Sequence, residues 1–240
     1  MANPDWTRDE LILALELYFR EPSARGSGTH PGCIDLSKVL NALPIHSNAS
    51  HENTFRNANG VGMKLSNFLK YDPSYTGKGL QSGSKLEAEV WASFASDLPR
   101  LASLATAIRA GISALNSRKE DIANLVDDDE AEEGKVLIAI HKRRERSATL
   151  SNNKKKQAFE THGRLACEVC EFDFQVVFGD HGAGYAECHH DKPISQLEPG
   201  SKTKLSDLRI VCANCHRMLH RGNPWPSVEK LRSMIASRKA

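Results

Sequence analysis

The sequence lacks any long apolar run and any strong excess of charge of one sign. No apolar stretch in its 240 residues approaches the ~20 that a membrane-spanning helix requires, and no charged segment with an apolar core opens it. We therefore expect a cytoplasmic protein with no membrane partner. The formal net charge of +2 is the sum of an uneven distribution, because an acidic run at 127–133 precedes a basic stretch at 142–156.

Cysteine is also scarce, and most of it is concentrated in two short motifs. Four of the six cysteines form two Cys-x-x-Cys pairs, which is the spacing of a closed tetrahedral zinc site. A redox role would need the βαβ context of thioredoxin-like motifs, which is absent around both pairs. The remaining two, Cys33 and Cys188, are expected to be unpaired thiols. The sequence thus predicts a structural Zn²⁺ held by Cys167, Cys170, Cys212 and Cys215.

Histidines lie between the cysteine pairs and just after them. His189 and His190 are adjacent, and Glu187 precedes them by two residues. His216 and His220 are four residues apart, so that both imidazoles lie on one face of a helix. This pattern predicts a second metal site, distinct from the cysteines and open to substrate.

The stretch from about 158 to 221 resembles the HNH (ββα-metal) nucleases. The run His189-His-Asp-Lys-Pro-Ile-Ser195 is similar to the catalytic strand of the nuclease colicins. The resemblance implies that His190 is the general base and that a divalent cation is held by three imidazoles, which are those of His189, His216 and His220.

Two acidic residues complete the set that the resemblance implies. Asp207 stands where the family has an Asn that orients the base, and Glu187 stands at a supporting acidic position. An Asp can accept the same Nδ1 hydrogen bond, but it favours the imidazolium and would raise the pKa of His190.

The implied reaction is phosphodiester hydrolysis with one divalent metal. A base must deprotonate water, and positive charge must stabilise the phosphorane and the departing oxygen. All-imidazole ligation suits Mn²⁺, Ni²⁺, Co²⁺ or Zn²⁺ better than Mg²⁺, so the metal stays open among these five. The alternative is a treble-clef zinc module that binds nucleic acid or protein without cleaving it.

Length and charge distribution predict two domains and a linker. A chain of 240 residues exceeds the ~100–200 typical of one domain. We expect an α+β protein, in which an α-helical DNA-recognition domain at 1–116 precedes a linker and connecting helix at 117–157. A zinc-stapled HNH nuclease domain with a C-terminal helix follows at 158–240. The basic part of the linker either contacts DNA phosphates, through Arg143, Arg144 and Lys155, or is solvated.

Helical signals are frequent in the first domain. A capping box at Thr7–Glu10 predicts a helix carrying Leu11, Leu15 and Tyr18. Further helices are expected over 36–43, 61–69 and 86–112, the last broken near Pro99. In the second domain, Ser227 is expected to cap a final helix.

Polar residues at 56–67 either read bases or shape a turn. Arg and Asn can hydrogen-bond guanine and adenine edges bidentately, whereas Asn and Gly also form turns and helix caps. The residues concerned are Arg56, Asn57, Asn59, Lys64 and Asn67. Aromatic side chains of this domain form either its core or a pocket for a modified base; they are Trp6, Tyr18, Phe19, Phe68, Tyr71 and Tyr75.

Three motifs of the first hundred residues are Trp6-Thr-Arg-Asp-Glu10, Arg56-Asn-x-Asn-Gly-Val-x-Met-Lys-Leu65 and Trp91-Ala-Ser-Phe94. With them this part of the chain resembles the domain that precedes HNH modules in bacterial restriction-type nucleases. The layout is similar to that of the modification-dependent McrA-like enzymes. These resemblances imply a restriction endonuclease that acts on double-stranded DNA carrying modified cytosine. Because one HNH centre hydrolyses one strand, a homodimer is one way to cut both strands, and two visits by one centre are another. The alternatives are an HNH nuclease or nickase acting on unmodified DNA, and a non-catalytic zinc-dependent DNA-binding protein.

Overall fold

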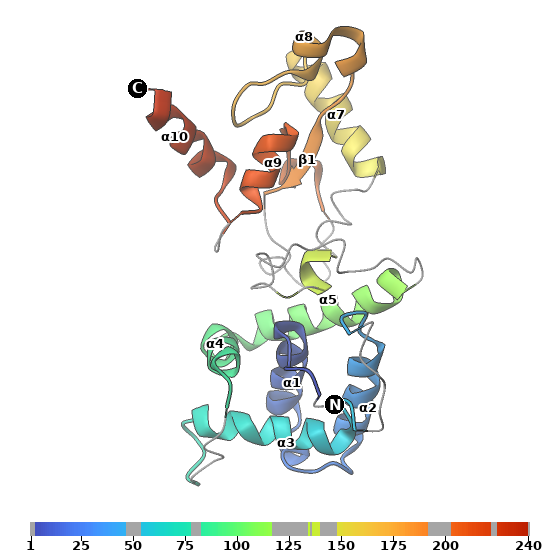
Figure 1. Ribbon diagram of the computed structural model, residues 1–240, viewed down its shortest axis with the longest axis vertical. Coiled ribbons are helices and arrows are strands. Elements are labelled where there is room, and N and C mark those ends of the chain that lie inside the picture. Colours follow the sequence, from blue (N-terminus) through green and yellow to red (C-terminus); the bar gives the residue numbers. More distant parts are fainter. Residues whose placement is uncertain are drawn as a thin grey trace. The chain divides into compact units, whose positions relative to one another are not determined.

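The chain divides into two compact units, residues 1–140 and 141–240 (Figure 1). The computed structural model describes residues 3–46, 54–77, 83–116, 134, 136–139, 148–191, 203–221 and 225–239. The division falls inside the segment 117–157 that the sequence predicts to be a linker. No helix among the described residues is long and apolar enough to cross a membrane.

The first unit is a bundle built around one helix. Helix α1 (Arg8–Arg20) lies at the centre and contacts α2 (Pro31–Ala42), α3 (Ala58–Phe68), α4 (Lys85–Phe94) and α5 (Leu98–Asn116) (Figure 1). Its central residues from Leu11 to Leu15 are at most 1% exposed, as expected of a helix covered on all sides. The predicted capping box is confirmed, since Thr7 and Glu10 cap each other's backbone at the start of α1.

Helix boundaries differ from the sequence prediction where proline sets them. Helix α2 begins at Pro31, five residues before the expected start, because Pro suits the first helical turn and His30 caps it through Gly32 N. The expected break near Pro99 is found between Phe94, the last residue of α4, and Leu98, the first of α5.

Two acidic residues of α1 are completely buried in the first unit. Glu10 accepts a 2.6 Å hydrogen bond from Nε of Arg56, whose side chain is also buried. Asp9 accepts hydrogen bonds from the backbone N atoms of Val136 (3.0 Å) and Leu137 (3.4 Å). These contacts tie residues far apart in the sequence to the start of α1.

The second unit contains a two-stranded antiparallel sheet with helices on it. Strand β1 (Glu187–His190) pairs with β2 (Leu208–Val211), and α9 (Ala213–Leu219) follows β2 directly. Before β1 come α7 (Ala148–His162) and α8 (Phe174–Phe178), and α10 (Val228–Lys239) ends the unit. The order strand, strand, helix is the ββα arrangement. The expected α+β class is confirmed.

The two faces of β1 differ in what they contact. Cys188 packs with Ala186 and Ile210, and its Sγ lies 3.3 Å from Oγ of Ser151 on α7. Successive strand residues point to opposite faces, so Glu187 and His189 face away from that cluster. Helix α9 contacts β1 and places its histidines next to His189.

Candidate metal centres

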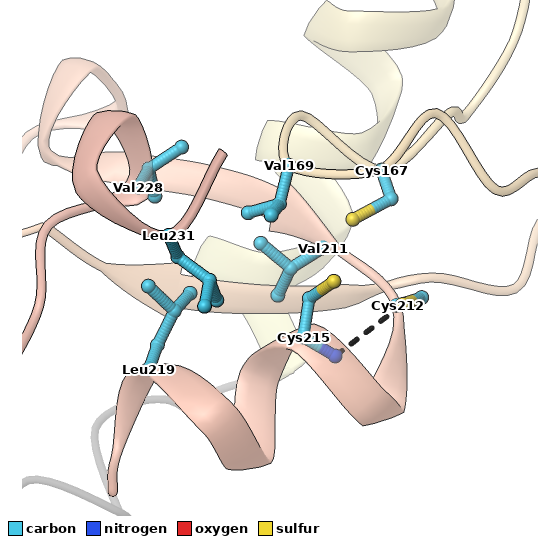
Figure 2. Packing of buried hydrophobic residues seen from close by; sticks show 8 residues of the cluster. All are labelled: Cys167, Val169, Val211, Cys212, Cys215, Leu219, Val228 and Leu231. Atoms are coloured by element: carbon cyan, nitrogen blue, oxygen red, sulfur yellow. Dashed lines mark hydrogen bonds between the residues drawn. The ribbon is translucent and has the colours of Figure 1, made fainter. Parts of the chain in front are cut away.

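The four cysteines of the two Cys-x-x-Cys motifs come together, with their sulfur atoms within 4.8 Å of one another. Cys167 and Cys170 lie on a tight turn in which Glu171 N donates to the carbonyl of Cys167. Cys212 caps α9 by accepting a hydrogen bond from the backbone N of Cys215, the dashed contact in Figure 2. Four thiols on two such turns match the donor set of a structural zinc ion.

The cysteine cluster is embedded in a small apolar core. Val169, Val211 and Leu219 surround it, and α10 covers it with Val228 and Leu231 (Figure 2). All five side chains are at most 8% exposed. An ion bound by the cysteines would therefore hold together the turn, the sheet, α9 and α10.

The thiols of this cluster differ in the direction in which the protein shifts their pKa values. Burial raises the pKa of the Cys167 thiol. Hydrogen bonds from the backbone N–H groups of Cys212 and neighbouring residues lower the pKa by more than burial raises it, so it lies below its usual value. Burial raises the pKa of Cys170 and of Cys215, which also face the other sulfurs. Four thiolates in one cluster require a cation to compensate their negative charge. A bound metal supplies that charge and deprotonates the thiols that coordinate it.

Three histidines converge at a second point. His189 on β1 meets His216 on α9 and His220 at its C-terminal cap, and their candidate ligand atoms lie within 4.8 Å of one another. The ring centroids are 4.9–5.4 Å apart, and the Nε2 atoms of His216 and His220 are 3.1 Å apart. Nitrogens that meet at one point fit a single divalent cation.

Glu187 sets the orientation of one of these histidines. Its Oε2 lies 2.6 Å from Nδ1 of His216. A carboxylate on Nδ1 fixes the ring and leaves Nε2 to bind a metal, the usual arrangement around ligating histidines. The hydroxyl of Tyr185 donates to the other oxygen of Glu187 at 3.4 Å.

Comparison with known families agrees with this geometry. Residues 167–222 match the family model described as HNH endonuclease. The chain carries an HNH endonuclease domain. The match begins at Cys167 and ends just beyond His220, so both clusters lie within it. No curated protein and no solved structure matches the chain in the other two comparisons.

The expected general base of the HNH domain is the last residue of β1. His190 is 4% exposed and pairs with Leu208 in the sheet register. Asp207 lies next to it, where its carbonyl accepts a 2.9 Å hydrogen bond from Asp191 N. Its carboxylate accepts from Lys204 N at 2.8 Å. Orientation of His190 by Asp207 stays a prediction.

Two aromatic residues at this site are absent from the sequence-based set. Trp225 places its ring 4.6 Å from that of His220, at 85°. Tyr185 contacts Glu187, and Nζ of Lys155 lies 5.8 Å from the Tyr185 ring centroid. No sequence spacing indicates either contact, because each depends on how a loop returns to the sheet. Lys155 of α7 thus lies beside the tyrosine that contacts Glu187.

The residues expected to read bases in the first unit mostly serve the fold. Arg56 is 3% exposed and donates to Glu10 and to the carbonyls of Pro4 and Asp5, so burial keeps it from a DNA groove. Lys64 pairs with the buried Glu87. The remaining three are Asn67, which donates to Glu87, Asn57, which caps α3, and Asn59, which is exposed. Arg143 and Arg144 lie outside the described residues.

Proposed function

We propose that this protein is a DNA endonuclease that hydrolyses phosphodiester bonds with one divalent metal. The observation that carries the proposal is the convergence of His189, His216 and His220, with Glu187 on the outer nitrogen of His216. This arrangement lies in a domain that matches the HNH endonucleases. A module that used its histidines only for packing would have no need of a carboxylate aimed at Nδ1.

His190 is proposed to begin the reaction. A neutral imidazole at the end of β1, adjacent to the ligand His189, is positioned to take a proton from an attacking water. Asp207 lies just before β2, where its carbonyl accepts from Asp191 N, and it is proposed to orient that imidazole through the Nδ1–H of His190. The adjacent Asp191 is held by Arg209, 3.0 Å away, which fixes the backbone just after the base.

The three imidazoles fit a divalent ion with an open coordination position. Such an ion would supply positive charge for the scissile phosphate and the leaving oxygen. The donor set favours Mn²⁺, Ni²⁺, Co²⁺ or Zn²⁺ over Mg²⁺. The four cysteines, closed and partly buried, are proposed to hold a separate structural Zn²⁺.

The finer proposal is a cytoplasmic restriction-type enzyme that cuts double-stranded DNA carrying modified cytosine. Support comes from the division into two units, which allows the first to choose the target and the HNH domain to cut it. A homodimer would place one HNH centre on each strand. Lys155, beside Tyr185, is proposed to hold a phosphate next to the cut.

The test is cleavage of plasmids that carry unmodified, methylated or hydroxymethylated cytosine, each with Mn²⁺, Ni²⁺, Co²⁺, Zn²⁺ or Mg²⁺. We expect cleavage of modified plasmid, lost in His190→Ala and kept in His181→Ala, which removes an exposed histidine of the same unit. Equal cutting of all plasmids would retain the nuclease and remove the modification dependence. A folded, zinc-loaded protein that binds DNA and cuts none would contradict the endonuclease proposal.

A further inference from the structure

A pocket of about 420 Å³ lies in the first unit. Three stretches that are distant in the sequence line it: residues 3–6, residues 54–64 and residues 84–86. Its volume falls in the range of ~300–1,000 Å³ typical of small-ligand sites. The pocket therefore has the volume of a small-ligand site.

One wall of the pocket is an indole held by two cations. The guanidinium carbon of Arg56 lies 4.7 Å from the Trp6 ring centroid, and Nζ of Lys64 lies 5.2 Å from it. Each cation is paired with a carboxylate that is at most 1% exposed, Arg56 with Glu10 and Lys64 with Glu87. The wall is thus fixed before any ligand arrives, which reduces the entropy lost on binding.

The backbone at this wall is held in a conformation that side chains rarely adopt. Arg56 has φ 44°, one of two positive values at residues other than glycine among those described. Its guanidinium donates to the carbonyls of Pro4 and Asp5, and so fixes the segment that carries Trp6. Strained positions that the surrounding structure maintains are concentrated at binding and catalytic sites.

The charge balance of the pocket indicates the kind of ligand. Both cations are already paired with buried carboxylates, so the described residues that line the pocket offer no unpaired positive charge for a phosphate. It offers instead a half-buried indole with polar groups around it, among them Asn3, Ser84 and the backbone of Gly60. A flat, neutral heterocycle with hydrogen-bonding edges matches this surface, because stacking and edge contacts are how proteins hold single bases.

We propose that this pocket holds one nucleobase, extruded from DNA and stacked on Trp6. The inference rests on the proposed endonuclease function, since the HNH domain makes DNA the substrate that the first unit meets. It assigns target inspection to Trp6 and its two cations. Arg56 and Lys64 act through Trp6, as residues that position it, rather than by contacting base edges themselves.

The three tryptophans of the chain allow a direct test. Trp6 reports on the pocket, and Trp225 reports on the metal site through its contact with His220. Trp91 packs against Tyr18 and Phe19 and serves as an internal control. Their indole N–H signals can be followed by NMR in zinc-loaded, full-length His190→Ala protein, with assignment by single Trp→Phe variants.

The probes are short duplexes that are fully paired or that carry one orphan base opposite an abasic site. We expect the Trp6 signal to shift with orphan-base duplexes while the Trp91 signal stays fixed. Binding should be on the order of tenfold tighter for the orphan-base duplexes, because the cost of unpairing is already removed. A Trp6 signal that stays fixed while that of Trp225 moves would overturn the pocket and leave the nuclease proposal intact.

Two variants separate stacking from folding. Trp6→Ala removes the indole. Leu86→Trp is designed to fill the pocket and to leave in place both Trp6 and the ion pairs of Arg56 and Lys64. Both should abolish the preference for orphan-base duplexes, and Met63→Ala, an exposed position on α3, should keep it. Retention of the preference in a folded Leu86→Trp protein would overturn the proposal. Failure of the nuclease proposal itself would give a different result. The wild-type protein would then cut no plasmid with any of the metals, and the Trp225 signal would not respond to DNA or metal.

Discussion

Oε2 of Glu187 lies 2.6 Å from Nδ1 of His216, across the space between β1 and α9. This contact holds the imidazole with its Nε2 3.1 Å from Nε2 of His220. The acid is 33% exposed, and the imidazole is 15% exposed. A partly exposed carboxylate can orient a metal-binding imidazole and leave the metal site accessible to substrate.

Replacing Glu187 should therefore weaken the histidine metal site and spare the cysteine site. We expect Glu187→Gln to lower affinity for Mn²⁺ or Ni²⁺ by roughly 10–100-fold, the usual effect of removing a partner of a metal-binding His. Calorimetric titration of zinc-loaded protein measures it. The control is Glu160→Gln on α7, an exposed acid. Equal affinities in wild type and Glu187→Gln would contradict the orienting role.

Replacing His190, the proposed general base, should lower the rate of cleavage and leave the affinities for metal and DNA nearly unchanged. In His190→Ala we expect cleavage to fall by roughly 10²–10⁴-fold, the usual contribution of a general base. Metal affinity and DNA affinity should stay within a factor of two or so, because the three ligating imidazoles remain. Single-turnover cleavage and electrophoretic mobility shifts measure the two quantities. A parallel loss of metal from this variant would instead make His190 a ligand.

Removing a cysteine should unfold the second unit alone. Structural zinc contributes about 10–16 kcal/mol in small zinc domains, so Cys212→Ser should release the ion and expose the core formed with Val211 and Leu231. Metal analysis and circular dichroism measure both. Cys188→Ala changes a buried thiol outside the cluster and should retain zinc. Full zinc retention in Cys212→Ser would exclude the four-cysteine site.

The buried pair of Glu10 and Arg56 should matter for stability of the first unit. Breaking a buried ion pair by removing one partner costs about 3–5 kcal/mol, because a charge is left without compensation. We expect Arg56→Met to lower the free energy of unfolding by that amount and Glu10→Gln/Arg56→Met to recover part of it. Urea denaturation measures the change. A double variant less stable than Arg56→Met would show that the pair is not the cause.

Asp9 should make the first unit less stable as pH rises. Burial raises its pKa from 3.8 to about 7, more than the hydrogen bonds from Val136 and Leu137 lower it. Between about pH 4 and 7 the folded state then keeps a proton that the unfolded state releases, so stability falls as pH increases through this window. Asp9→Asn should remove that loss, on the order of a few kcal/mol at pH 8.

The measurement for Asp9 is the difference in unfolding free energy between the variant and wild type from pH 5 to 8. The difference should grow with pH and level off above the raised pKa. A difference independent of pH would mean that Asp9 is ionised throughout, held by the two backbone donors.

Local patterns predicted much of the fold. The capping box of Thr7 and Glu10 starts α1 as expected, because its contacts span only three residues. Helix α7 shows no comparable signal, since none of its residues is fully buried and its apolar positions have no clear period. The sequence therefore predicts only a basic connecting segment where the structure has a helix of the second unit.

The sequence by itself determined which residues can bind metal. Two Cys-x-x-Cys turns and a pair of histidines four residues apart fix their donor atoms locally, whatever surrounds them. Tertiary structure decided how these residues are used. The Glu187–His216 contact joins residues 29 positions apart, and the Glu10–Arg56 pair joins residues 46 apart. Only packing reveals that Arg56 is buried rather than presented to DNA, because burial depends on which distant segments cover it.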